Sequence, residues 1–341
     1  MELEKKVIQG KRRINPRHAL YTVIITLILL ELNGSISPSL RSRFFYFLVG
    51  LQRFLTRNLE PLEKIERIQQ LEKLIEDELP NESKQNILGV PTGIKVEWCD
   101  PQEEHNTEQV ILYLHGGAYV SKTPVFHRQY ARRIASLSRC RALYVDYRLA
   151  PKHPFPAALE DAFAAYEWLL ASGFKAENIV IMGDSAGGGL SASTLIYLRE
   201  HQLPLPKCTV LISPWLDLAG TGNSIHRLED ADKQLTWANL EVYAKSYALN
   251  HPITHPLISP LYANLEDLPP ILLIAGGKEI LLDDTLRFAD RLFMVNSEVE
   301  LLIEPNMGHV FSIFEPLIPE AVKVNRQTAE FIRSQLNDDQ S

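Results

Sequence analysis

The stretch IVIMGDSAGGG, residues 179–189, joins an apolar run typical of a buried strand to a run compatible with a helix. At the junction, Ser185 stands at the centre of the pattern G-x-S-x-G. A serine on such a sharp turn has strained backbone angles, and a side chain two positions before or after it would collide. The two glycines and the helix N-terminus that follows therefore predict that Ser185 is a nucleophile. The alternative is an ordinary tight turn or a phosphate-binding glycine loop.

Short apolar runs recur along the chain from about residue 95, with helical patterns between them. Strands that are apolar throughout are typical of a parallel sheet buried on both faces. The alternation therefore predicts an α/β fold, a mostly parallel sheet with helices on both faces. The expected strands are IKVEW, QVILYL, ALYVD, NIVIMG, CTVLIS, ILLIAG and VELLIE, and the expected helices cover residues 126–138, 157–172, 186–201, 285–295 and 319–335.

Two parts of the chain depart from this alternation. Residues 1–85 contain helical patterns and no strand pattern, and residues 219–265 contain one helical stretch, 235–248. We therefore expect an N-terminal helical segment at 1–85 and an insertion above the sheet at 219–265. The two parts of the α/β core are then 86–218 and 266–341.

The composition excludes several classes of partner. The 341 residues have a formal net charge of −7 and no long basic block, so we expect no nucleic-acid partner. The three cysteines are far apart and form no C-x-x-C pair, which argues against a disulfide framework and favours a reducing, cytoplasmic location. No pair of histidines has metal-ligand spacing beside a carboxylate, so we expect no metal ion.

Residues 17–32 form an apolar segment with a basic flank. Its apolar run, Ala19 to Leu30, is shorter than the roughly 20 residues that a membrane-spanning helix needs. We expect a helix packed on the body of the protein. The alternatives are an interfacial helix that contacts a membrane through residues 17–32, and a cleaved signal peptide.

A second glycine-containing loop, His115-Gly116-Gly117-Ala118, follows the run VILYL. Acyl transfer passes through a tetrahedral oxyanion that backbone N–H groups stabilise, and glycine lets the backbone approach closely. We expect the N–H groups of Gly116, Gly117 and Ala186 to form this oxyanion hole. His115 comes too early in the chain to be the base, and we expect it to anchor the loop.

The base of a serine nucleophile should lie in the loop after the last strand, within reach of the serine hydroxyl. His309 lies in a glycine-containing loop directly after the run VELLIE, residues 299–304. We therefore expect His309 to be the base, the alternative being a surface or core histidine.

Several motifs together resemble the hormone-sensitive-lipase-like branch of the α/β-hydrolase esterases, which includes arylacetamide and steryl-acetate deacetylases. They are HGGA at 115–118, DYRLAPKHPFPAALEDA at 146–162, GDSAGG at 183–188, SPWLDL at 213–218 and GHVF at 308–311. The resemblance covers residues 94–335. It implies the α/β-hydrolase fold, with an eight-stranded, mostly parallel sheet. It also implies a helical cap built from the N-terminal segment and the insertion.

The resemblance further implies hydrolysis of small to medium acyl esters through an acyl-enzyme, with a small-molecule ester as partner and no cofactor. The alternatives are a membrane-associated deacetylase of apolar acetyl esters, a lactonase or amidase with the same triad, and a non-catalytic receptor for a small molecule. A homodimer is also considered, although the sequence leaves the oligomeric state open.

Three carboxylates compete for the role of the triad acid, Glu279, Asp283 and Asp284, all after the strand run ILLIAG. The resemblance places Glu279 at the position of the acid, where it would orient the imidazole. Asp283 is the reserve candidate. Asp283 and Asp284 fall where a helix begins, and we expect them to cap its N–H groups.

Overall fold

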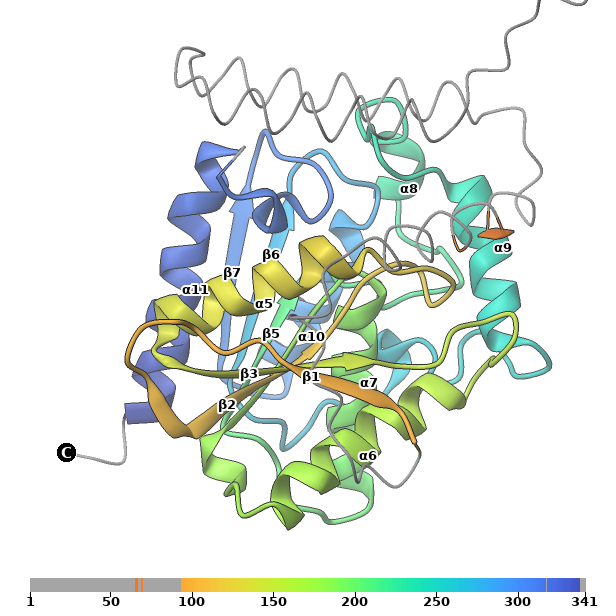
Figure 1. The fold of residues 1–341 in the computed structure, drawn as a ribbon. Coiled ribbons are helices and arrows are strands. Elements are labelled where there is room, and N and C mark those ends of the chain that lie inside the picture. The colour runs from red at the N-terminus through yellow and green to blue at the C-terminus, as the bar shows by residue number, and fades with distance from the viewer. Residues whose placement is uncertain (1–64, 67–68, 70–92, 317, 338–341) are drawn as a thin grey trace, which may run out of the picture.

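The computed structural model describes residues 65–66, 69, 93–316 and 318–337 (Figure 1). Residues 17–32 and almost all of the N-terminal segment 1–85 lie outside this part of the chain. Among the described residues, no helix has both the length and the apolar character needed to cross a membrane.

Seven strands of the described residues form one sheet in the order β1-β3-β2-β4-β5-β6-β7. β1 is antiparallel to β3 and every other pair is parallel, so the predicted mostly parallel sheet is confirmed. All seven apolar runs form strands, and the described sheet has seven strands where the resemblance implied eight. The strands are β1 (Lys95–Trp98), β2 (Asn106–Leu114), β3 (Cys140–Asp146), β4 (Ile179–Asp184), β5 (Cys208–Ile212), β6 (Ile271–Gly276) and β7 (Val299–Glu304).

Helices cover both faces of the sheet, because alternate side chains of each strand point to opposite faces (Figure 1). Ile111 and Val180 belong to the core that α5 and α11 cover, and these two helices pack against each other. Leu112 and Ile181, the next residues along the same strands, belong to the core under α6, α7 and α10. The helices are α5 (Pro124–Ser138), α6 (Ala157–Ala171), α7 (Ala186–Glu200), α8 (Ser224–Arg227), α9 (Trp237–Ala248), α10 (Leu282–Met294) and α11 (Pro319–Asn337), with 3-10 turns η2 (Ala176–Asn178), η3 (Pro260–Tyr262) and η4 (Phe311–Phe314).

Residues 219–265, the expected insertion, contain α8, α9 and η3. This range is described throughout and has no strand. The Thr236 hydroxyl caps α9 by accepting the backbone N–H of Asn239 at 3.3 Å. The buried residues of α9 share one face of the helix, and on that face Tyr247 stacks on Tyr119 with ring centroids 3.8 Å apart. Because Tyr119 directly follows the HGGA loop, the insertion packs against that loop.

The loops that follow the parallel strands meet at one edge of the sheet, because parallel strands point their carboxyl ends the same way. The HGGA loop follows β2 and Ser185 follows β4 directly. Ser213 follows β5, Glu279 comes three residues after the end of β6, and His309 comes five residues after the end of β7. This edge therefore gathers the residues that the sequence singled out, together with Ser213, which it did not.

Candidate active site

Ser185 occupies the sharp turn between β4 and α7, with φ 52° and ψ −121°. A non-glycine residue at positive φ is strained. The backbone N–H of Ser185 donates to the carbonyl oxygen of Ile212 at 2.8 Å, which holds the turn in this conformation. A Cβ on Gly183 would lie 2.3 Å from the carbonyl oxygen of Gly187, and a Cβ on Gly187 would lie 2.1 Å from that of Leu114. Both glycines are therefore required by the close approach of backbone to backbone.

The three predicted side chains form one hydrogen-bonded chain. His309 Nε2 lies 2.8 Å from Ser185 Oγ, and His309 Nδ1 lies 2.5 Å from Glu279 Oε2. Glu279 is fully buried, and Ser185 and His309 are each less than a tenth exposed. The arrangement can pass a proton from the hydroxyl to the imidazole while the carboxylate stabilises the resulting cation.

Ser213 is a member of this site that the sequence analysis did not identify. Its hydroxyl donates to Glu279 Oε1 at 2.9 Å and accepts the backbone N–H of Val310 at 3.0 Å. Glu279 Oε1 also accepts the N–H of Gly276 at 2.8 Å. Both oxygens of the carboxylate are therefore fixed, and Ser213 links it to the residue after His309. The only indication of Ser213 in the sequence was the motif SPWLDL, which begins at this serine.

The pKa of His309 is raised above its ordinary value of 6.5. Burial alone would lower this pKa, but the hydrogen bond to Glu279 and the charge of Glu279 outweigh burial. The charges of Asp232 and Asp184 raise the pKa further. The carboxylates around His309 therefore favour its protonated, imidazolium form.

Gly116 does not have the role that the sequence predicted. Its N–H donates to Asp184 Oδ1 at 3.0 Å, so it is not available to an oxyanion. Within the described part of the chain, the N–H groups of Gly117, Ala118 and Ala186 have no hydrogen-bond partner. Ala118, at φ 53°, was not among the donors expected from the sequence. A sequence shows which loop carries glycines, but it does not show which peptide of the loop already has an acceptor.

Asp184 fixes the HGGA loop through the backbone of Gly116. Besides the N–H of Gly116, its Oδ1 accepts the hydroxyl of Tyr113 at 2.6 Å, and its Oδ2 lies 3.5 Å from His127 Nε2. A Cβ on Gly116 would lie 2.3 Å from Asp184 Oδ2, which explains the glycine. Burial tends to raise the pKa of Asp184, but His127 and the hydrogen bonds lower it overall.

His115 anchors the loop, in agreement with the sequence analysis. The ring is fully buried, and its Nδ1 lies 2.7 Å from the carbonyl oxygen of Gly116. It stacks on Tyr147 with centroids 4.1 Å apart, and the hydroxyl of Tyr147 donates to the His115 carbonyl oxygen at 2.6 Å. Burial lowers the pKa of His115 well below its ordinary value, so the ring is neutral.

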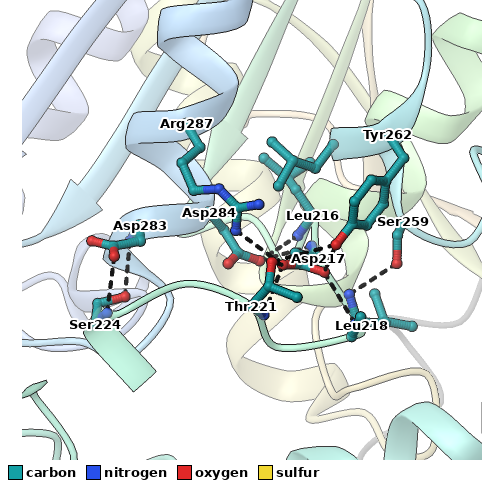
Figure 2. A network of polar contacts seen from close by, with 12 residues as sticks. Leu216, Asp217, Leu218, Thr221, Ser224, Ser259, Tyr262, Asp283, Asp284 and Arg287 are labelled. Carbon is teal, nitrogen blue, oxygen red and sulfur yellow. Dashed lines mark hydrogen bonds and ion pairs between the residues drawn. The ribbon is translucent and has the colours of Figure 1, made fainter. Parts of the chain in front are cut away.

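Asp283 and Asp284 bind backbone of the insertion and of the chain just before it, as Figure 2 shows. Asp283 Oδ2 accepts the N–H of Ser224 at 2.9 Å. Asp284 Oδ2 accepts the N–H groups of Leu216 and Asp217 at 2.9 and 2.8 Å. Both carboxylates lie in the first turn of α10, where the sequence placed the start of a helix. The predicted capping of its N–H groups is wrong, because α10 has no side-chain cap hydrogen bond and these carboxylates bind other segments. Of the three candidate acids, Glu279 is the one hydrogen-bonded to His309.

The described residues contain no cluster of three or more His, Cys, Asp or Glu side chains placed to hold a metal ion.

Residues 111–313 match the family model described as alpha/beta hydrolase fold. The chain belongs to the α/β-hydrolase fold family.

Similar proteins within this fold family are named as esterases or acetyl-hydrolases. An acetyl-hydrolase of Streptomyces hygroscopicus is 35% identical over 72% of this chain and 84% of the relative. An esterase of Acinetobacter venetianus is 35% identical over 66% of this chain and 75% of the relative. A crystal structure of an esterase from the bacterial hormone-sensitive lipase family is 36% identical, with a TM-score of 0.78, and the match covers 89% of this chain and 99% of that one. The predicted resemblance to hormone-sensitive-lipase-like esterases is confirmed.

The buried carboxyl group of Asp284 makes the stability of the protein depend on pH in a way that can be measured. The carboxyl group is fully buried, and burial and then the charge of Asp217 raise its pKa well above the ordinary value. A carboxyl group with a raised folded pKa stabilises the fold below its unfolded pKa, and this contribution is lost as the pH rises toward the folded pKa. Asp284→Asn stays neutral and keeps one oxygen for the two backbone N–H groups.

The free energy of unfolding of Asp284→Asn should therefore increase relative to wild type between about pH 4 and pH 8. Urea denaturation at a series of pH values measures this difference. Asp290→Asn, an exposed change on the same helix, is the control and should follow wild type. A constant difference between Asp284→Asn and wild type would contradict the neutral buried carboxyl.

Proposed function

We propose that the protein hydrolyses carboxylic esters through a Ser185-His309-Glu279 triad and an acyl-enzyme intermediate. The observation that carries the proposal is the hydrogen-bonded chain itself, with 2.8 Å between Ser185 Oγ and His309 Nε2 and 2.5 Å between His309 Nδ1 and Glu279 Oε2. Relatives named esterase and acetyl-hydrolase support the same reaction class.

In this mechanism His309 Nε2 takes the proton of Ser185 as the hydroxyl attacks the ester carbonyl carbon. The negative charge of the tetrahedral intermediate meets the N–H groups of Gly117, Ala118 and Ala186, which have no partner in the described part of the chain. His309 then gives its proton to the leaving alcohol. A water molecule, activated by His309 in the same way, releases the acid and restores the serine.

Glu279 has the role of the acid, which orients the imidazole and stabilises its cation. Its second oxygen is fixed by Ser213 and by the N–H of Gly276, so the carboxylate keeps one orientation. Glutamate has one methylene more than aspartate, and these two contacts restrict the additional torsion angle.

The substrate is a small-molecule ester with a small to medium acyl group, and no cofactor takes part in the reaction. The name acetyl-hydrolase of one relative supports a short acyl group. We also propose a cytoplasmic location, which the three buried free cysteines at 99, 140 and 208 support.

Ser185→Ala removes the nucleophile and should lower kcat for p-nitrophenyl acetate on the order of 10⁶-fold. The control is the thermal unfolding midpoint, which should stay near that of wild type because the change removes one oxygen at the surface of the site. A variant that hydrolyses the ester at the wild-type rate would contradict the proposal.

Glu279→Gln and Asp283→Asn form a matched pair. Glu279→Gln should lower kcat by about 10⁴-fold, because the amide favours the wrong imidazole tautomer. Asp283→Asn should cost stability through its contact with Ser224 and keep a kcat close to wild type.

The pH dependence of kcat/KM tests the same two variants, Glu279→Gln and Asp283→Asn, in a second way. Because the pKa of His309 is raised, the acid limb of kcat/KM should lie above the ordinary imidazole pKa of 6.5 in wild type and in Asp283→Asn. In Glu279→Gln this limb should move to lower pH, since the charge that raises the pKa is gone. The opposite assignment of the two variants would identify Asp283 as the acid.

A further inference from the structure

The turn that carries Glu279 is held by two side chains of the insertion. Asp232 Oδ2 accepts the backbone N–H of Ile280 at 2.9 Å. The hydroxyl of Ser224 donates to the carbonyl oxygen of Ile280 at 2.7 Å. The nitrogen of Ile280 belongs to the peptide bond that Glu279 itself forms, so the insertion contacts the backbone of the acid directly.

Ser224 also ties the insertion to the start of α10. Its hydroxyl accepts the N–H of Asp283 at 3.0 Å, and its own N–H donates to Asp283 Oδ2 at 2.9 Å (Figure 2). Gly222 allows this approach, because a Cβ there would lie 2.9 Å from the Cβ of Asp283. The pair is thus reciprocal, and each residue donates a backbone N–H to the side chain of the other.

Both contacts come from fully buried side chains. Asp232 Oδ1 accepts the N–H groups of Gln234 and Leu235 at 2.8 and 2.9 Å, which fixes the carboxylate within its own loop. A buried carboxylate that joins two loops through backbone N–H groups sets their separation, because each broken contact leaves a buried polar group unpaired.

We propose that Asp232 and Ser224 are positioning residues for the triad acid, through which the insertion fixes the backbone of Glu279 against His309. The proposal rests on the proposed function and deepens it. The insertion then completes the site, since the carboxylate end of Glu279 is fixed by Ser213 and Gly276 while the backbone after it is fixed by Asp232 and Ser224.

Asp232 also acts on His309 through its charge. Burial lowers the pKa of His309, and the carboxylates of Glu279, Asp232 and Asp184 raise it, with Glu279 contributing most. A change at Asp232 should therefore alter the pH profile, whereas a change at the uncharged Ser224 should act through position alone.

The test uses the full chain with Asp232→Asn, Ser224→Ala and the control Asp230→Asn, whose exposed carboxylate lies two residues from Asp232. Active sites are counted by titration with diethyl p-nitrophenyl phosphate, so that kcat for p-nitrophenyl acetate refers to folded, reactive protein. KM, the pH profile of kcat/KM and the thermal midpoint are measured in parallel.

Asp232→Asn should lower kcat per titrated site by about 10- to 100-fold with KM within about 2-fold, because a small displacement of the triad affects the reaction more than binding. Its acid limb should move to lower pH. Ser224→Ala should lower kcat in the same direction with the acid limb less displaced, and Asp230→Asn should match wild type.

A structural role alone would give a lower thermal midpoint and fewer titrated sites, with wild-type kcat per site and an unshifted pH profile in both variants. That result would overturn the positioning role. Glu279→Gln and Ser185→Ala separate the two proposals; their kcat is referred to folded protein concentration, because Ser185→Ala has no nucleophile to titrate. If both lose kcat while Asp232→Asn and Ser224→Ala keep the wild-type kcat per site, the esterase mechanism stands and the positioning role fails.

Discussion

The hydrogen bond between Glu279 and His309 is the contact on which the geometry of the site depends. It joins the loops after β6 and β7, and a shift of either loop would separate the two side chains. Parallel neighbouring strands bring these loops to one edge of the sheet, and the buried carboxylate keeps a fixed direction because other donors occupy its second oxygen. The serine on the turn after β4 then needs only to meet the remaining nitrogen of the imidazole.

Three residues with strained backbone lie around this contact. Ser185, Ser213 and Val310 are non-glycine residues at φ 52°, 44° and 46°, and such conformations cost on the order of 1–3 kcal/mol each. The N–H of each strained residue donates to a neighbouring strand or loop. The N–H of Ser185 donates to the carbonyl oxygen of Ile212, and that of Ser213 donates to the carbonyl oxygen of Ile274 at 2.6 Å. The N–H of Val310 donates to the hydroxyl of Ser213. The parallel sheet therefore offsets the strain that directs the side chains into the site.

Local patterns predicted the parts of the site that depend on neighbouring residues in the chain. The strand, the glycines and the helix around Ser185 lie within eleven consecutive residues, 179–189, and the placement of His309 follows from the preceding strand. The oxyanion donors were only partly predicted, because the acceptor of the Gly116 N–H is Asp184, 68 residues away. Asp232 gave no signal, since a single carboxylate in a helical insertion is usually exposed, and only the fold places it against Ile280.

Covalent labelling tests the central claim most directly. The protein is treated with diethyl p-nitrophenyl phosphate, digested and analysed by mass spectrometry, with His309→Ala treated in parallel. Wild type should gain one diethylphosphoryl group per chain, on Ser185, and should do so rapidly; His309→Ala should gain it far more slowly. Ester hydrolysis that continues with Ser185 unlabelled, or stoichiometric labelling of another residue, would contradict the claim.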